Sequence, residues 1–250
     1  MTRFAPLCLC LLLAGTVQAW AEPITIPRAE EFFPDTVGSR WRYQGRIEES
    51  PLQRVSSKQF ENVSTVKGAE TLKGVAVKVF HDSNPGNHGV SDSYYRRDAA
   101  GIVYYGSRPG TPLERQLVPY QIVRFPLIVP SSFQQFDRKG LTLGDDLDGD
   151  AQDEKVDVDA TVTVAGEEDV TVPAGTYTQA VKVVATMRMH IHLTGLPRTI
   201  VGTDTMTAWF VRGIGLVKYV ERQDIPPVRS ERGLITEITE ELEEVRIKPQ

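Results

Sequence analysis

The stretch VKVVATMRMHIHL, residues Val181–Leu193, alternates between apolar and polar side chains. Every odd-numbered residue in it is apolar, and all but one of the even-numbered residues are polar or charged. Successive side chains of a β-strand point to opposite faces of a sheet. The stretch therefore predicts a long antiparallel strand with one buried face, which places Met187 and Met189 inward and His190 and His192 outward.

The same period of two recurs along most of the chain. It is clear in VDVDATVTV, residues Val156–Val164, where valines alternate with Asp and Thr. The tail, residues 234–247, is predicted as a strand because it is rich in β-branched residues, although some of its apolar residues also have helical spacing. The only helical turn expected is a short one at Ala29–Phe33. Further strands are predicted at Arg40–Glu49, Gln59–Lys67, Gly74–Asp82, Val90–Asp98, Ile102–Ser107, Tyr120–Val129, Thr203–Val211 and Leu216–Arg222.

These elements predict an all-β protein. We expect a curved antiparallel sheet, either an open half-barrel or two sheets that share one core, with less than about 15% helix. Pro173-Ala174-Gly175-Thr176 predicts a type II turn in which Gly175 takes the positive φ that this turn requires. Residues 22–250 are expected to form a single β-rich domain, and the acidic loop near 144–155 marks the boundary between two meanders if the domain is divided.

Composition and charge exclude several classes of protein. Of the 250 residues, 40% are hydrophobic and 24% are charged, which is typical of a globular chain and not of a disordered one. The chain has 28 Lys and Arg against 33 Asp and Glu, a net charge of −5. This balance argues against a nucleic-acid partner, so the partners expected are an envelope protein or a lipophilic ligand.

The first 21 residues have the pattern of a cleavable signal peptide. Arg3 gives a short positive region, an apolar run follows, and Ala19 and Ala21 supply small residues before a cleavage point at Glu22. The apolar run is shorter than the ~20 residues of a membrane span. Cleavage would remove Cys8 and Cys10, the only cysteines, and would leave a periplasmic or secreted bacterial protein that has no disulfide and does not span a membrane.

Three groups of motifs stand out along the chain. They are FFP at Phe32–Pro34 with VG at 37–38 and WRY at Trp41–Tyr43, then VPAGTY at Val172–Tyr177, and finally WFV at Trp209–Val211 with GIGLVK at Gly213–Lys218. In these motifs the chain resembles a family of uncharacterised exported bacterial all-β proteins and lipoproteins. The resemblance implies an open half-barrel similar to that of lipoprotein carriers, and it supplies no catalytic residue. This chain departs from many members because it lacks a lipidated cysteine.

The acidic loop is the strongest candidate for a metal site. Calcium binds six to eight oxygen ligands, and closely spaced carboxylates on a tight turn supply them. Asp146, Asp148 and Asp150 occupy positions 1, 3 and 5 of the calcium-loop pattern, and Asp157 occupies position 12. Asp153 is a further carboxylate of the loop, which we include in the predicted calcium site. The alternative is a solvated acidic loop without a metal, since position 6 is Ala151 and not the usual glycine.

Other catalytic or metal-binding patterns are weak. His190 and His192 share the outer face of one strand, and a metal there would need His81 or His88 as an additional ligand. No cysteine follows the signal peptide, and neither a Gly-x-Ser-x-Gly nor a His-Glu-x-x-His motif occurs. The sequence therefore predicts no catalytic residue and no cofactor other than calcium.

Three functions are consistent with these observations. The first is a non-catalytic exported protein of the bacterial envelope with a binding or structural role, stabilised by calcium. The second is a carrier that holds a lipophilic ligand or a lipoprotein in the concave sheet, which a large uncovered apolar concavity would favour. The third is a hydrolase whose acids converge only in three dimensions, which clustered acids of raised pKa would favour.

Overall fold

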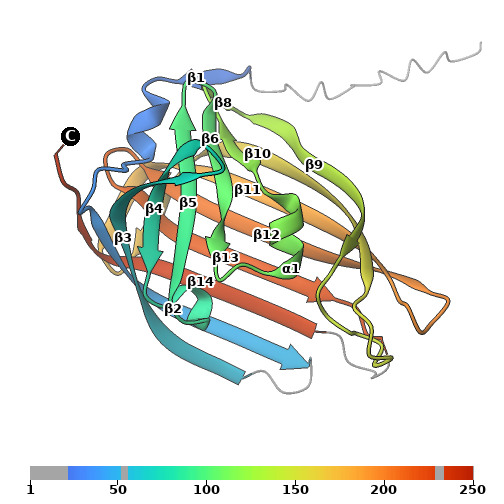
Figure 1. Cartoon of the computed structure of the whole chain (residues 1–250). Helices are drawn as coiled ribbons and strands as arrows, with labels where there is room; N and C mark the ends of the chain where they lie inside the picture. The colour runs from blue at the N-terminus through green and yellow to red at the C-terminus, as the bar shows by residue number, and fades with distance from the viewer. Residues whose placement is uncertain (1–21, 52–55, 229–233, 250) are drawn as a thin grey trace, which may run out of the picture.

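A twelve-stranded antiparallel sheet makes up most of the protein (Figure 1). The computed structural model describes residues 22–51, 56–228 and 234–249; the predicted signal peptide lies outside them. Strand accounts for 67% of the structure and helix for 6%, which confirms the predicted all-β class. The strand order is β7-β6-β5-β4-β3-β2-β14-β13-β12-β11-β10-β9, and a small second sheet pairs β1 with β8.

The elements follow one another as a meander. The first half of the chain contains β1 (Ile24–Ile26), η1 (Ala29–Phe32), β2 (Arg40–Pro51), β3 (Ser56–Leu72), β4 (Val75–Asp82), η2 (Pro85–Asn87), β5 (Ser91–Asp98), β6 (Gly101–Arg108), α1 (Pro112–Leu117), β7 (Tyr120–Arg124) and β8 (Leu127–Val129). The second half contains β9 (Ser131–Thr142), β10 (Lys155–Val172), β11 (Gly175–His192), β12 (Thr199–Val211), β13 (Gly215–Ile225) and β14 (Leu234–Arg246).

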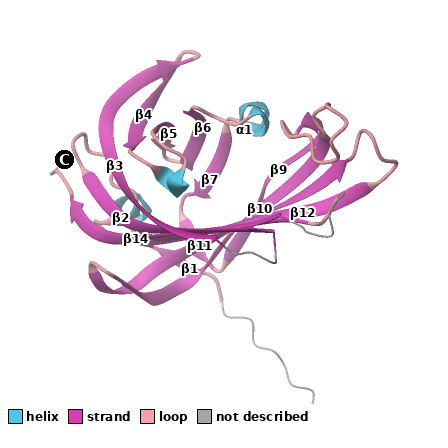
Figure 2. Cartoon of the chain, turned by 90° about the horizontal axis from the view of Figure 1, so that it is seen from below, coloured by secondary structure: helices cyan, strands magenta, loops and turns pink. Residues whose placement is uncertain are grey.

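The large sheet curves until its two edge strands come near each other. Figure 2 shows β3 to β7 folding back over the surface formed by β10 to β14. The edges are β7 and β9, and the side chain of Gln135 on β9 donates a hydrogen bond to the carbonyl oxygen of Gln121 on β7, at 3.0 Å. The rings of Tyr120 on β7 and Phe136 on β9 lie 5.4 Å apart. We call the concave side of this sheet the inner face.

The strand that decides the fold behaves as its sequence predicts. Val181, Met189 and Ile191 of β11 are almost completely buried, and β11 pairs with β10 and β12 along nearly its whole length. Gly175, at the β10–β11 turn, has a φ of 137°. Glycine adopts this positive φ readily, but Gly175 pairs with Val172, so Pro173 and Ala174 are the two central residues of the turn. The predicted type II turn with Gly175 at its third position is therefore wrong. The tail is a strand and not a helix: β14 pairs with both β2 and β13 and thereby joins the two ends of the meander.

The structure corrects three further local expectations. The single strand predicted over Tyr120–Val129 is wrong, because Pro126 lacks an N–H group and the chain breaks there into β7 and β8, which belong to different sheets. Strand β9 was not expected, since its Gln- and Ser-rich sequence has little apolar alternation. Helix α1 was missed too, although Thr111 and Glu114 form a capping box at its start.

Candidate functional site

The acidic loop between β9 and β10 brings three carboxylates together. One carboxylate oxygen from each of Asp146, Asp148 and Glu154 lies within 4.8 Å of the others. Among the described residues no other group of three acidic, His or Cys side chains is this compact. Asp148 and Glu154 are both fully buried, whereas Asp146 is exposed. We call these three residues the loop carboxylates.

The two buried members connect this loop to the β11–β12 loop. Glu154 accepts hydrogen bonds from the backbone N–H groups of Leu147 and Asp148 and, with its other oxygen, from the N–H of Thr194 at 2.8 Å. The Oδ2 atom of Asp148 accepts the N–H of Gly195 at 2.7 Å. Its Oδ1 atom is buried and has no hydrogen-bond partner. A buried carboxylate oxygen without a partner is costly, and a bound cation would satisfy it.

The loop carboxylates match the predicted calcium ligands only in part. Asp146 and Asp148 are brought together, but Asp150, Asp153 and Asp157 are not members of the group, and Glu154 takes their place. Asp157 lies on β10, where it accepts the N–H of Gly140 at 2.7 Å and lies 3.3 Å from His192. These two contacts, the Gly140 hydrogen bond above all, lower its pKa.

The backbone turns sharply at Ala151, which is position 6 of the calcium-loop pattern described above. Ala151 has a φ of 67°, the left-handed conformation for which glycine is usual. Asp146 accepts the N–H groups of Gly149, Asp150 and Ala151, which closes the turn. The loop therefore turns at an alanine that adopts the conformation usual for glycine.

Four further carboxylates lie on the inner face: Asp82 on β4, Asp204 on β12, Glu221 on β13 and Glu240 on β14. Burial raises the pKa of Tyr120 on β7, and nearby charges, those of Asp204 and Glu221 among them, raise it further. Because β7 is far from β12 and β13 in the strand order, these residues face one another across the concave side. We call the four residues the inner carboxylates.

Two of the inner carboxylates are strongly perturbed. Burial, reinforced by the charge of Glu221, raises the pKa of Asp204 to about 8. Burial also raises the pKa of Glu240 to about 7, although hydrogen bonds from the Gly86 N–H and from Asn62 oppose the shift. Both side chains therefore carry a proton over part of the neutral pH range.

Asp204 is the member without a partner. It is 5% exposed, its Oδ1 atom is buried and unbonded, and no ion pair of the described residues includes it. Its neighbours across the strands are Met187 on β11 and Gln223 on β13. Glu221, by contrast, accepts a hydrogen bond of 2.6 Å from the hydroxyl of Tyr219.

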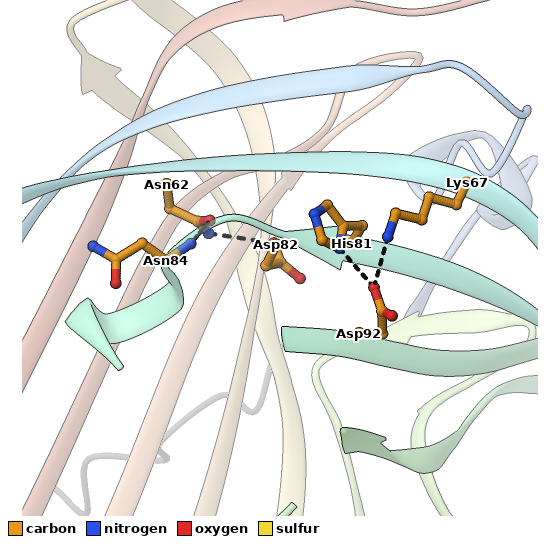
Figure 3. Close-up of polar contacts among 6 residues, drawn as sticks. All are labelled: Asn62, Lys67, His81, Asp82, Asn84 and Asp92. Carbon is orange, nitrogen blue, oxygen red and sulfur yellow. Dashed lines mark hydrogen bonds and ion pairs between the residues drawn. The ribbon is translucent and has the colours of Figure 1, made fainter. Parts of the chain in front are cut away.

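His81 and Lys67 lie on the face of the sheet opposite to Asp82. Figure 3 shows His81 and Lys67 directed toward Asp92, at 2.7 Å and 3.4 Å, while Asp82 receives the side-chain amide of Asn62. His81 and Asp82 are consecutive on β4, so their side chains point to opposite faces. The same Asn62 amide lies 3.3 Å from Glu240. Thus no ion pair joins an inner carboxylate to a Lys, Arg or His in the described ranges.

An aromatic row crosses the inner face beside these acids. Neighbouring ring centroids are 5.1–6.2 Å apart, which is the usual spacing of interacting aromatic pairs. Tyr95, Tyr104 and Tyr120 in its centre are half-buried, and burial raises the pKa of each. The row consists of Trp41, Phe80, Tyr95, Tyr104, Tyr120 and Phe136.

Sequence reasoning missed all four inner carboxylates, yet a signal for one of them was present. Asp204, Met206 and Ala208 alternate along β12, so their side chains point to the same, inner face. A charged residue among the apolar positions of an alternating strand marks a buried polar group. The predicted His190–His192 pair gains no third ligand: His81 is bound by Asp92, and no His of the described chain belongs to a compact metal-binding group.

Comparisons with known proteins leave the chain without an assigned family. No protein-family model and no curated protein matches it. A Bacteroides fragilis protein with a YmcC-like fold, thought to be exported, has 15% identity and a TM-score of 0.37, covering 86% of this chain and 98% of its own. A Parabacteroides distasonis protein thought to be a lipoprotein has 15% identity, the same coverage and a TM-score of 0.35. These scores are low, so the likeness decides neither fold nor function.

None of the helices in the described ranges has the length and apolar character that crossing a membrane requires.

Proposed function

We propose that this chain is an exported, non-catalytic binding protein of the bacterial envelope that holds its ligand on the inner face of the curved sheet. One observation carries the proposal. Asp204 is 95% buried, has an unbonded carboxylate oxygen and lies on the inner face of β12, opposite Met187. Buried polar groups in native proteins almost always have partners, so a ligand group is the natural partner of Asp204.

The composition of the inner face argues against a carrier of anionic lipids. Above their raised pKa values of about 8 and 7, Asp204 and Glu240 are anions, and a fatty acid or phospholipid would bring a further negative charge close to them. Like charges in a poorly solvated site repel each other strongly. The inner face therefore fits the lipophilic-carrier alternative less well than the binding of a ligand with a polar group that complements the acids.

A hydrolase is the second candidate, and one observation favours it. Asp204 and Glu221 interact electrostatically, and a proton held by Asp204 near neutral pH is the property expected of a general acid. Sustained release of product from an envelope glycan or ester at neutral pH, abolished by Asp204→Asn, would replace the binding proposal with this one.

The same protein is proposed to bind one calcium ion at Asp146, Asp148 and Glu154. The support comes from the unbonded, fully buried Oδ1 atom of Asp148 and from the carboxylate oxygens gathered within 4.8 Å. Calcium prefers hard oxygen ligands of this kind. Because Glu154 and Asp148 also bind Thr194 and Gly195, the ion would hold the β9–β10 and β11–β12 loops together.

Native mass spectrometry of the protein purified from its own envelope tests the proposal as a whole. We expect a chain that begins at Glu22, one calcium ion and a small organic molecule that the Asp204→Asn variant no longer retains. A retained Met1 or an acylated start would contradict export through a cleaved signal peptide. A wild-type mass without any organic molecule would contradict the binding function.

A further inference from the structure

We infer that the ligand of the inner face is a small organic cation, an amine whose positive charge lies beside Asp204. The inference rests on the proposed binding function and adds the chemical class of the ligand. It follows from three features of the described residues: the charge of the inner carboxylates, the aromatic row, and the spacing of the acids.

The first feature is negative charge without a counter-charge. Asp82, Asp204, Glu221 and Glu240 share the inner face, and no ion pair connects any of them to a base in the part of the chain that the structure describes. His81 and Lys67 bind Asp92 on the other face, and only the charge of His81 reaches Asp82. Lys78 of β4 lies opposite Tyr95 and therefore on the inner face, but among the described residues it forms no ion pair with an inner carboxylate. A buried carboxylate is stable as an anion only when a positive charge is paired with it. A cationic ligand would supply that charge.

The second feature is the aromatic row. The face of an aromatic ring attracts a cation, and the attraction grows when water is excluded. Tyr120 lies close enough to Asp204 and Glu221 for their charges to raise its pKa. Its ring lies between those of Tyr104 and Phe136 in the row. Met187 faces Asp204 from β11 and adds a polarisable apolar surface. These side chains suit the organic part of an amine.

The third feature, the spacing of the acids, favours an organic cation over a hard metal ion. Calcium and other hard cations require several oxygen ligands within one coordination sphere. Among the described residues only the loop carboxylates form such a group, and the inner carboxylates are more widely dispersed. A larger cation, whose charge is carried by an organic group, can lie among acids spaced in this way.

A series of three phenyl compounds that differ in charge tests the inference. The probes are phenethylamine, 2-phenylethanol and phenylacetate, and their binding to the full-length mature protein is measured by calorimetry at about pH 8.5 and about pH 6. We expect phenethylamine to bind about tenfold more tightly than the alcohol and phenylacetate not to bind. The affinity for the amine should fall toward pH 6, because Asp204 and Glu240 take up protons there and lose the charges that hold it.

Two variants locate the effect. Asp204→Asn keeps the shape of the side chain and removes its charge, so it should weaken amine binding by about tenfold or more. Asp224→Asn makes the same change on the outer face of β13, one residue beyond the partner of Asp204, and should leave affinity within about twofold. Glu221 and Tyr219 from β13 and Tyr120 from β7 also face Asp204 and remain unchanged in both variants.

Each contrary result has a separate meaning. Equal binding of the alcohol and the amine would overturn the cation and leave inner-face binding intact. Affinity that rises as the pH falls would point to a neutral hydrogen-bond acceptor held by protonated Asp204, and it would overturn the inference too. If none of the three compounds binds, the inference fails, and the proposed function is then judged by the native mass spectrum alone.

Discussion

Asp204→Asn is expected to stabilise the ligand-free protein by about 2–3 kcal/mol near pH 6, with a rise in melting temperature of roughly 5–10 °C there and a larger rise at higher pH. The reason is the folded-state pKa of Asp204, which burial and the charge of Glu221 raise from 3.8 to about 8. Folding then requires either a buried anion without a partner or the uptake of a proton. Asparagine is neutral at every pH and has neither cost.

The sign of the pH dependence follows from this shift. Between about pH 4 and pH 8 the folded protein holds a proton on Asp204 that the unfolded chain has released, so stability falls as the pH rises. The stability associated with protonated Asp204 is fully present below the unfolded pKa and is lost as the pH passes through the folded one. Glu240, with a pKa raised to about 7, adds to the same trend.

Thermal melts of the wild type and the variant across this range provide the measurement. The two curves should converge toward pH ~4, where Asp204 is protonated in both the folded and unfolded states, and diverge steadily toward higher pH. Asp224→Asn, on the outer face, should follow the wild type throughout. A variant that is less stable than the wild type at every pH would show that Asp204 is a stabilising anion, contrary to its unpaired burial.

Calcium is expected to raise the melting temperature by a similar amount. A ligand that binds only the folded state stabilises it by about 2.7 kcal/mol at a hundredfold excess over its dissociation constant. For a domain of this size that is roughly 5–10 °C. Asp148→Asn should abolish the rise, because it weakens the buried ligand whose Oδ1 atom has no other partner. Magnesium should substitute poorly, because it demands tighter octahedral geometry and retains its waters.

A matched control lies within the same loop. Asp153 is exposed and is not one of the loop carboxylates, so Asp153→Asn should leave the calcium-dependent rise unchanged. The quantity compared is the difference between melts in millimolar calcium and in a chelator, which separates metal binding from any general loss of stability. An unchanged wild-type melt under these two conditions would show that the loop binds no calcium.

The fold could be predicted from local pattern because burial of one sheet face imposes a period of two. Val181–Leu193 and Val156–Val164 therefore identify β11 and β10 directly, and β-branched residues identify the tail as β14. The pattern fails where another constraint decides. Pro126 breaks a strand in an otherwise apolar run, and β9 is held by its pairing to β10 and not by its own alternation.

The candidate sites were less predictable because they depend on distant segments. Glu154 becomes a buried member of the loop carboxylates through Thr194, 40 residues away along the chain. Asp82 and Glu240 meet only because the last strand, β14, pairs with β2 and the loop at Gly86 folds onto Glu240. Aspartate spacing finds Asp146 and Asp148, but the convergence of the inner carboxylates is a product of sheet curvature.

Carbon-detected NMR titration of the side-chain carboxyl groups tests the central claim most directly. The claim is that Asp204 is a buried, unpaired acid on the inner face and binds a cationic ligand. It predicts one aspartate carboxyl carbon that titrates near pH 8, disappears in Asp204→Asn and shifts to lower pH when phenethylamine is added. If every aspartate titrates near the ordinary value of 3.8, and phenethylamine moves none of them, the account of this site is contradicted.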